Sequence, residues 1–309
     1  METLYFVLSG AHRTIPFEEV RALHEAEECP LRVLSEHFGL VLAEGDPECS
    51  SRIMYRSAFV KEVGEVFAIG DDVGVSVFKD FQCSRYHLRK LGGLKVPRFE
   101  DLLKGEGICR IVVTEGFYLI GRTLAKRKEG KSKKGPFFSP GSMDPILARA
   151  MVNLSRLKRG GTFLDPFCGT AVYAIEASKV AGRTYCSDLD PAMCYGGRIN
   201  TQWAGVLGDN ILSDSYYLPF RNSSIQAIAT DPPYGRSVVS LAHRPEELLL
   251  GFLERAYEVL KPGSWIAFAS SSKVNVPEVI ASTSFELGRC HVQRVHRSLA
   301  RLICTARKP

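Results

Sequence analysis

From residue 145 onward, segments with apolar residues at helical spacing alternate with short apolar runs typical of buried strands. Helices are predicted at 145–157, 170–180, 191–203 and 245–260, and strands at 162–167, 183–190, 225–235 and 264–271. This alternation predicts an α/β fold with a mostly parallel sheet covered on both faces. Ligands of such sheets bind at the carboxyl ends of the strands.

The first 123 residues predict two smaller α+β modules. A strand at 4–10, a helix at 17–28 and two strands within 31–45 predict a module over residues 1–50. A second module, over 51–123, follows from four further patterns. They predict a helix at 51–70, a strand running into a basic helix at 74–93, a short helix at 99–105 and a strand hairpin at 109–124 around Glu115.

Residues 124–144 are rich in Lys, Gly, Ser and Pro, and the first part of this segment lacks hydrophobic periodicity. Such composition predicts a linker. The C-terminal domain is therefore expected at 145–309.

Composition narrows the class of protein. The chain has 309 residues, of which 45% are hydrophobic and 24% charged, which excludes a disordered chain or a small disulfide scaffold. No apolar run approaches the length of a membrane-spanning helix, and no basic signal region precedes the first strand, so a cytoplasmic protein is expected. The nine cysteines form no C-x-x-C pair and their number is odd, which favours reduced, buried thiols. No metal site is predicted.

Positive charge is unevenly distributed. Residues 1–122 carry 15 basic and 19 acidic residues, whereas 123–140 carry six basic residues and one acidic residue. The short basic segment includes Lys126, Arg127, Lys131 and Lys133. This is how a surface that meets a polyanion would be arranged, although a solvated linker explains the same residues.

Two motifs predict a nucleoside pocket. In DPFCGTA (165–171), Gly169 permits a tight turn beneath a ligand, but one glycine does not make the G-x-G-x-x-G pattern of dinucleotide sites. About 20 residues later, Asp188 in SDLDP stands where a carboxylate accepts hydrogen bonds from a ribose. Asp190, before Pro191, is a candidate helix N-cap, and either Asp188 or Asp190 fits the N-cap role.

The third motif, DPPYG (231–235), follows an apolar strand. Two prolines fix the backbone and remove two N–H donors, which leaves carbonyl oxygens as acceptors. Asp231 beside them accepts a hydrogen bond from an exocyclic amine, and Tyr234 offers a ring on which a base stacks. The arrangement predicts a site that orients an aromatic amine toward an electrophilic methyl group.

DPFCGTA, SDLDP and DPPYG resemble, in order and spacing, the class I S-adenosylmethionine-dependent amino-methyltransferases. FFSPGSMDPILARAM (137–151) and the ending HRSLARLICTARKP (296–309) are similar to the tRNA guanine-N2 methyltransferases that modify position 10. The resemblance implies a Rossmann-like domain with a seven-stranded sheet at 145–309. It also implies a ferredoxin-like domain at 1–50 and a THUMP RNA-binding domain at 51–123, on weaker matches.

Residue by residue, the resemblance implies that Asp165, Phe167 and Gly169 surround the methionine part of S-adenosylmethionine and that Asp188 binds its ribose. Asp214 takes the adenine position, with Asp209 as its competitor. Asp231 and the Pro232 carbonyl, followed by Pro233, hold the target amine, while Tyr234 stacks on the base. Lys126, Arg127, Lys131 and Lys133 are the candidate contacts to RNA.

Three alternatives stay open at this point. The same motif logic serves enzymes that methylate another RNA or DNA base or a protein amide, although a THUMP-like module accompanies RNA substrates. A non-catalytic tRNA-binding protein of this fold is a second alternative. An NAD-dependent oxidoreductase shares only the general fold. The number of methyl groups added and the need for a small activator subunit are open, and a monomer is expected.

Overall fold

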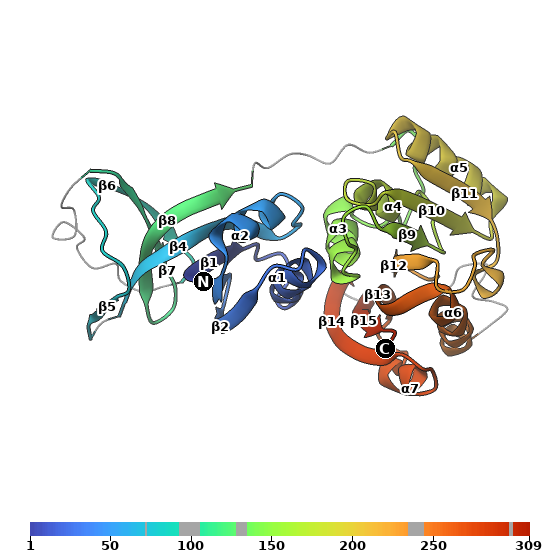
Figure 1. Cartoon of the computed structure of the whole chain (residues 1–309). Coiled ribbons are helices and arrows are strands. Elements are labelled where there is room, and N and C mark those ends of the chain that lie inside the picture. Colours follow the sequence, from blue (N-terminus) through green and yellow to red (C-terminus); the bar gives the residue numbers. More distant parts are fainter. Residues whose placement is uncertain (72, 93–105, 128–134, 234–243, 297–298) are drawn as a thin grey trace. The chain divides into compact units, whose positions relative to one another are not determined.

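The computed structural model describes residues 1–71, 73–92, 106–127, 135–233, 244–296 and 299–309 (Figure 1). The chain forms two compact units, Met1–Gly130 (unit 1) and Lys131–Pro309 (unit 2). Among the described residues, no helix combines the length and the apolar character that crossing a membrane requires.

Unit 1 is built on one eight-stranded sheet. Its strand order is β2-β3-β1-β4-β8-β7-β6, and β5 pairs with β4. The strands are β1 (Glu2–Leu8), β2 (Leu31–His37), β3 (Leu40–Gly45), β4 (Val60–Gly70), β5 (Val75–Val77), β6 (Arg85–Lys90), β7 (Ile108–Val113) and β8 (Tyr118–Lys126). The helices are α1 (Ile15–Ala26) and α2 (Pro47–Met54). The expected domain boundary at residue 50 falls inside α2, and β4 joins both predicted modules in this sheet.

Two of the predicted helices in unit 1 are wrong. The helix expected at 51–70 ends at Met54, and β4 occupies most of the remainder. β4 is buried along most of its length, so its apolar residues do not alternate and resemble a buried helix. The basic helix expected within 74–93 is the edge strand β6, whose pairing with β7 overrides its local sequence. The helix expected at 99–105 lies outside the described residues.

The other strands and the remaining helix predicted within residues 1–50, and the hairpin at 109–124, are confirmed. The strand at 4–10, the helix at 17–28 and the strand pair within 31–45 correspond to β1, α1 and β2–β3. The hairpin around Glu115 is β7–β8, in which Val113 pairs with Tyr118.

His24 of α1 is buried in unit 1. Its Nδ1 lies 2.7 Å from the Val20 carbonyl oxygen and its Nε2 lies 3.1 Å from Ser50 Oγ. Burial lowers the pKa of His24 to about 4, because the charged imidazolium loses hydration there.

This burial predicts a pH-dependent stability. Between pH 6.5 and 4 the unfolded chain takes up a proton at His24 and the folded chain does not, so the free energy of unfolding falls with the pH. From pH 7 to 5 we expect this residue to contribute a loss of about 2 kcal/mol. Urea unfolding of wild type and His24→Gln at both pH values measures it. An equal pH dependence in the two proteins would contradict the expectation.

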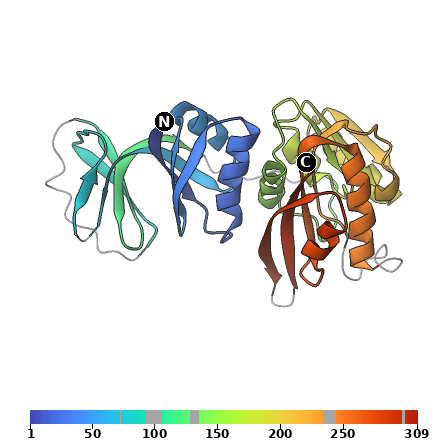
Figure 2. The ribbon, with the colours of Figure 1, turned by 60° about the horizontal axis from the view of Figure 1, so that its bottom comes forward.

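Unit 2 holds the predicted α/β fold. Its seven-stranded sheet has the order β11-β10-β9-β12-β13-β15-β14. The strands are labelled in Figure 1, and Figure 2 gives a second view of the ribbon. The first five strands in that order run parallel, and β15 pairs antiparallel with both β13 and β14. The strands are β9 (Thr162–Asp165), β10 (Arg183–Asp188), β11 (Gly208–Leu212), β12 (Ile225–Thr230), β13 (Leu260–Ser271), β14 (Glu286–His296) and β15 (Leu299–Arg307).

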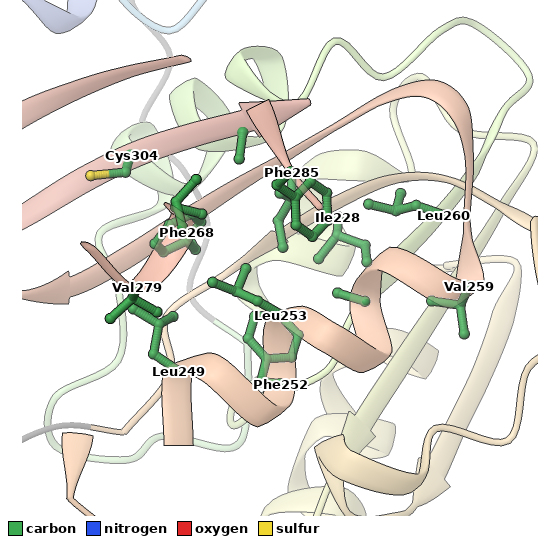
Figure 3. Close-up of a cluster of buried hydrophobic side chains, with 14 of the residues drawn as sticks. Ile228, Leu249, Phe252, Leu253, Val259, Leu260, Phe268, Val279, Phe285 and Cys304 are labelled. Atoms are coloured by element: carbon green, nitrogen blue, oxygen red, sulfur yellow. The ribbon is translucent and has the colours of Figure 1, made fainter. Parts of the chain in front are cut away.

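Helices pack against this sheet, as the alternating pattern predicts. They are α3 (Pro145–Leu154), α4 (Val172–Ala177), α5 (Pro191–Trp203), α6 (Pro245–Val259) and α7 (Val276–Ala281), with a short 3-10 helix η2 (Ser215–Tyr217). A hydrophobic core of the unit lies where α6 meets the sheet (Figure 3). Phe252 and Leu253 of α6 pack there with Ile228 of β12 and Phe268 of β13, all fully buried. This core holds β12 and the residues that follow it in place.

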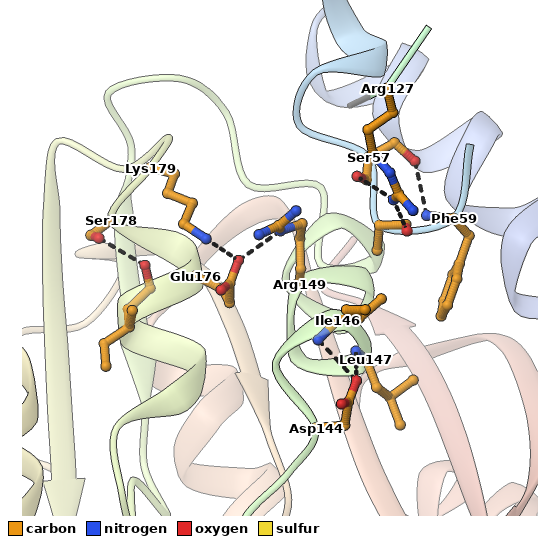
Figure 4. A network of polar contacts seen from close by, with 12 residues as sticks. Ser57, Phe59, Arg127, Asp144, Ile146, Leu147, Arg149, Glu176, Ser178 and Lys179 are labelled. Atoms are coloured by element: carbon orange, nitrogen blue, oxygen red, sulfur yellow. Dashed lines mark hydrogen bonds and ion pairs between the residues drawn. The ribbon is translucent and has the colours of Figure 1, made fainter. Parts of the chain in front are cut away.

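Buried charge also ties α3 to α4. Asp144 begins α3 by accepting hydrogen bonds from the backbone N–H groups of Ile146 and Leu147 at 2.9 and 3.1 Å. Glu176 of α4 is buried, and it accepts from Arg149 Nε of α3 at 2.7 Å and from Lys179 Nζ at 2.6 Å (Figure 4). The two cations compensate the negative charge of the buried Glu176 carboxylate.

The expectation of reduced cysteines is wrong. Eight of the nine cysteines form four disulfides, Cys29–Cys49, Cys83–Cys109, Cys168–Cys186 and Cys290–Cys304, and Cys194 is free. The partners are 14 to 26 residues apart and are brought together by tertiary structure. Cys290 and Cys304, for example, are paired across β14 and β15. Local spacing in the sequence therefore carries no signal of these pairs.

Candidate active site

A cavity of about 380 Å³ opens at the edge of the unit 2 sheet where the parallel strands end. Residues that follow β9, β10, β11 and β12 line it, together with Leu248 of α6. The lining residues are Pro166, Phe167, Asp188, Leu189, Asp190, Met193, Asp214, Ser215, Tyr216, Asp231, Pro233 and Leu248. The three predicted motifs thus meet at one site, as the topology of a parallel sheet requires.

Asp165, the last residue of β9, is fully buried behind this cavity. Its Oδ1 accepts hydrogen bonds from Thr230 Oγ1 at 2.7 Å and from the Phe167 backbone N–H at 3.2 Å. Its Oδ2 is also buried and has no hydrogen-bond partner among the described residues. Burial raises the pKa of Asp165 to about 7, and the charges of Asp188 and Asp231 act in the same direction.

Asp188 ends β10 and is held by the turn beside it. The Gly169 N–H donates to Asp188 Oδ2 at 2.8 Å, and the Asp190 N–H donates to Oδ1 at 3.0 Å. Gly169 adopts a left-handed φ of +50°, which favours glycine at this turn. The two backbone bonds fix the rotation of the carboxylate, and each oxygen keeps a lone pair for a ligand. Burial raises the pKa of Asp188.

The structure also shows which of Asp188 and Asp190 is the helix N-cap. Its carboxylate accepts from the Ala192 N–H at 2.8 Å, and Pro191 is the first residue of α5. Asp190 is therefore the N-cap of α5, and it lines the cavity beside Asp188.

The structure also separates Asp214 from Asp209. Asp214 lines the cavity and caps η2 by accepting from the Tyr216 N–H at 2.9 Å. Asp209 forms an exposed ion pair with Arg183 and is not among the lining residues. Of the two candidates for the adenine position, Asp214 is the one at the cavity.

Asp231 follows β12 directly, and its carboxylate meets a cation there. Arg301 Nη1 of β15 donates to Asp231 Oδ2 at 2.9 Å. Pro232 is buried, and Pro233 lines the cavity. Tyr234 lies outside the described residues.

The structure describes two of the four basic residues that are candidate contacts to RNA, and these two differ in exposure. Lys126 is the exposed last residue of β8. The Arg127 guanidinium donates to the carbonyl oxygens of Ser57 and Ala58, so it is engaged by the backbone of unit 1 (Figure 4). Lys131 and Lys133 lie outside the described residues.

Sequence reasoning missed several residues at the site. Met193, Tyr216 and Leu248 add apolar surface to the cavity, but each lies in a segment that reads as an ordinary helix or loop. Arg301 carried a stronger signal, because it stands within the apolar run at 299–304, where a charged residue is unusual.

Comparison with known proteins agrees with this geometry. Residues 133–303 match the family described as UPF0020: RMKL-like, methyltransferase domain. The chain is 31% identical to the tRNA (guanine(10)-N2)-dimethyltransferase of Methanothermobacter thermautotrophicus, over 96% of this chain and 97% of the relative. It is 30% identical to the protein of the same name from Methanocaldococcus jannaschii, over 98% and 99% of the two chains.

The chain belongs to the tRNA (guanine-10-N2)-methyltransferase family. Its fold is similar to that of TrmN from Thermus thermophilus, with a TM-score of 0.53 and 17% identity over 99% of this chain and 100% of TrmN. The resemblance to the tRNA guanine-N2 methyltransferases is confirmed, and so is the class I methyltransferase fold of unit 2.

Proposed function

We propose that this family member transfers methyl groups from S-adenosylmethionine to the exocyclic N2 of guanosine 10 in tRNA, giving N2-methylguanosine or N2,N2-dimethylguanosine. The observation that carries the proposal is the cavity in which Asp188 and Asp231 meet at the carboxyl edge of a class I methyltransferase sheet. The tRNA and the target atom are taken from the names of relatives matched over nearly their full length.

The residues present fit S-adenosylmethionine. Asp165 Oδ2 is a buried acceptor that lacks a partner among the described residues, which suits the methionine ammonium group, with Phe167 and Gly169 beside it. Asp188 offers fixed acceptors for the two ribose hydroxyls, and Asp214 and Tyr216 line the place for the adenine. When bound, S-adenosylmethionine supplies an electrophilic methyl group on a sulfonium, whose sulfur keeps the electron pair of the broken bond.

The residues after β12 then orient the substrate. Asp231 accepts a hydrogen bond from the guanine amino group and the Pro232 carbonyl accepts another, so the nitrogen lone pair is directed at the methyl group. Pro233 keeps the backbone rigid, and Tyr234 stacks on the base. The amine gains one methyl group and releases one proton to water for each transfer. A guanine in a helix must first be flipped out, at a cost of a few kcal/mol.

Unit 1 supplies the proposed RNA surface. We assign residues 1–50 to a ferredoxin-like part and 51–123 to a THUMP part, followed by the linker at 124–144. Arg85, Arg89 and Lys90 lie on β6, beside Arg110 of β7, and the buried Glu62 holds Arg110 at 2.7 and 2.8 Å. The exposed cations of β6, Arg85 and Lys90, are the proposed contacts to RNA phosphates. The protein is proposed to act as a cytoplasmic monomer, without a metal.

Neutralising basic residues near the linker tests the RNA contacts. We expect Lys126→Gln combined with Lys131→Gln and Lys133→Gln to weaken tRNA binding and to reduce the slope of log K against log salt by about 2 to 3. Adding Arg127→Gln also removes the bonds to Ser57 and Ala58, so it is made separately. Filter binding from 50 to 300 mM salt provides the measurement.

Three exposed cations elsewhere form the control. Arg221, Lys261 and Lys273 are exposed in unit 2, and their replacement by glutamine changes the net charge equally. If both triple variants bind tRNA alike, the linker cations have no special role.

One experiment tests the proposed function as a whole. An unmodified tRNA transcript is incubated with the protein and labelled S-adenosylmethionine, and its nucleosides are analysed by mass spectrometry. We expect label in N2-methylguanosine or N2,N2-dimethylguanosine, and its loss when guanosine 10 is replaced by adenosine. Label in another nucleoside would move the activity to another base, and cofactor binding without transfer to any RNA would indicate a binding protein.

A further inference from the structure

The guanidinium of Arg301 and the carboxylate of Asp231 form a half-buried ion pair at the carboxyl edge of the unit 2 sheet. The two side chains are 11% and 19% exposed. Charge-assisted bonds of this kind are shorter and more directional than neutral ones, and they are stronger away from bulk water. The pair therefore restrains Asp231 more than a surface ion pair would.

The strand order brings Arg301 to this place. β13 lies between β12 and β15 in the sheet. β15 runs antiparallel to β13, and Arg301 is paired with Ser271, the last residue of β13. The start of β15 thus lies at the edge where the parallel strands end. The arginine side chain is long enough to pass the end of β13 and reach the residue after β12.

A second contact orients the arginine from the outermost strand. Arg301 Nε donates to Gln293 Oε1 at 2.5 Å, and Gln293 is the residue paired with Arg301 across β14 and β15. The planar guanidinium is therefore bound through Nε on one side and through Nη1 on the other. This geometry sets the direction of its bond to Asp231, which a flexible ammonium could not do.

The surrounding charges explain the need for a cation. The described carboxyl groups in or behind the cavity, besides Asp231, are Asp165 at the end of β9, Asp188 at the end of β10, Asp190 after β10 and Asp214 after β11. Tyr216 adds a phenol to the lining. The four carboxyl groups disfavour ionisation of a further carboxyl group beside them. A guanidinium in contact with Asp231 offsets this repulsion.

We propose that Arg301 is a positioning residue for methyl transfer, which keeps the Asp231 carboxylate ionised and fixes its rotation so that it accepts a hydrogen bond from the target amine. The proposal rests on the proposed function of Asp231. It also implies that Asp231 orients the amine and does not carry its proton away, because a carboxylate stabilised by a guanidinium is a weak base.

Arg301→Gln and Arg301→Lys test this role in the full-length protein with an unmodified tRNA transcript. For Arg301→Gln we expect kcat to fall about 100-fold, because small misplacements of an orienting group cost that much. The KM for tRNA and the Kd for S-adenosylmethionine should stay within about threefold. The acidic limb of the pH profile of kcat should move to higher pH, because the carboxyl group loses the cation beside it. Arg301→Lys should return the acidic limb to its wild-type position but recover only part of kcat.

Arg307→Gln is the matched control. Arg307 lies on the same strand, and its ion pair with Glu286 at 3.6 Å is exposed. We expect its kcat and pH profile to equal those of wild type. Gln293→Leu, which removes the second contact of Arg301, should lower kcat by less than Arg301→Gln does.

Several outcomes would overturn the proposal. An unchanged or higher kcat in Arg301→Gln would show that the pair is dispensable or restrains Asp231 in an unproductive position. A lower kcat with an unmoved acidic limb would show a packing role alone. If Arg301→Gln melts below the assay temperature, Arg301→Lys and Gln293→Leu test the proposal in its place. Wild-type rates in both of these variants would contradict it. Failure of wild type to methylate tRNA would instead refute the proposed function.

Discussion

Replacing Asp231 by alanine is expected to lower kcat for methyl transfer about 1,000-fold or more while tRNA affinity stays nearly unchanged. The side chain is proposed to hold the amine at the position from which its lone pair attacks, and removal of one preorganised polar group of this kind costs about 100- to 1,000-fold. Its loss also leaves Arg301 without the carboxylate it contacts at 2.9 Å. Single-turnover transfer and filter binding, made on the same preparations, measure the two quantities separately.

Asp231→Asn is the matched variant for that experiment. The amide keeps one acceptor oxygen but loses the charge that pairs with Arg301, so its rate should lie between those of alanine and wild type. Thermal melting of all three proteins shows whether the fold is intact. Turnover close to wild type in Asp231→Ala would remove the residue from its proposed role, whatever the state of the ion pair.

The fold of unit 2 could be predicted from the sequence because its signal is local. Each predicted strand is a short apolar run between amphipathic helices, and the parallel order follows from that alternation. β11 and the β14–β15 hairpin gave weaker signals, since β11 is partly exposed and β14 carries polar residues at most positions. In unit 1, β4 and β6 are defined by their partners in the sheet, and no local pattern reveals such pairing.

The site could be predicted in part, because its motifs are also local patterns in the sequence. Five Asp-Pro pairs occur in the chain. Those at Asp46, Asp144 and Asp190 cap helices, whereas those at Asp165 and Asp231 follow strands at the cavity. A preceding strand alone does not distinguish the two uses, because Asp46 caps α2 directly after β3.

What the sequence could not show is contact across the sheet. Arg301 reaches Asp231 from 70 residues away, and Asp165 is buried by residues that are distant along the chain. The four disulfides have the same origin, because tertiary structure and not spacing brings their cysteines together, as strand pairing does for Cys290 and Cys304.

Binding of S-adenosylmethionine is expected to weaken as the pH falls from 7 to 5. Burial raises the pKa of Asp165 to about 7, so below that pH the free protein holds a proton on this carboxyl group. The methionine ammonium, which stays protonated in this range, favours the ionised form, and binding must then release the proton. The apparent Kd should therefore rise toward about tenfold per pH unit below 7. Calorimetry at pH 5, 6 and 7 measures it.

Asp165→Asn separates this cause from others. The amide does not titrate, so its Kd should be higher than that of wild type at pH 7 and should not change with pH. Asp209→Asn, which alters an exposed carboxylate outside the cavity, should keep the wild-type dependence. Parallel pH curves for wild type and Asp165→Asn would contradict the assignment.

The same carboxyl group gives a second, independent readout without cofactor. Because its pKa in the folded state is raised above 3.8, the folded protein binds more protons than the unfolded chain between pH 4 and 7. Its contribution to the free energy of unfolding is present below pH 4 and is lost as the pH rises to about 7. Cofactor affinity and the stability contribution of Asp165 should thus change in opposite directions with pH. If Asp165 binds the ammonium group, affinity for the cofactor must rise with pH while the stability contribution of Asp165 falls. If Asp165 has only a structural role, the stability contribution still falls with pH but the affinity does not depend on this residue.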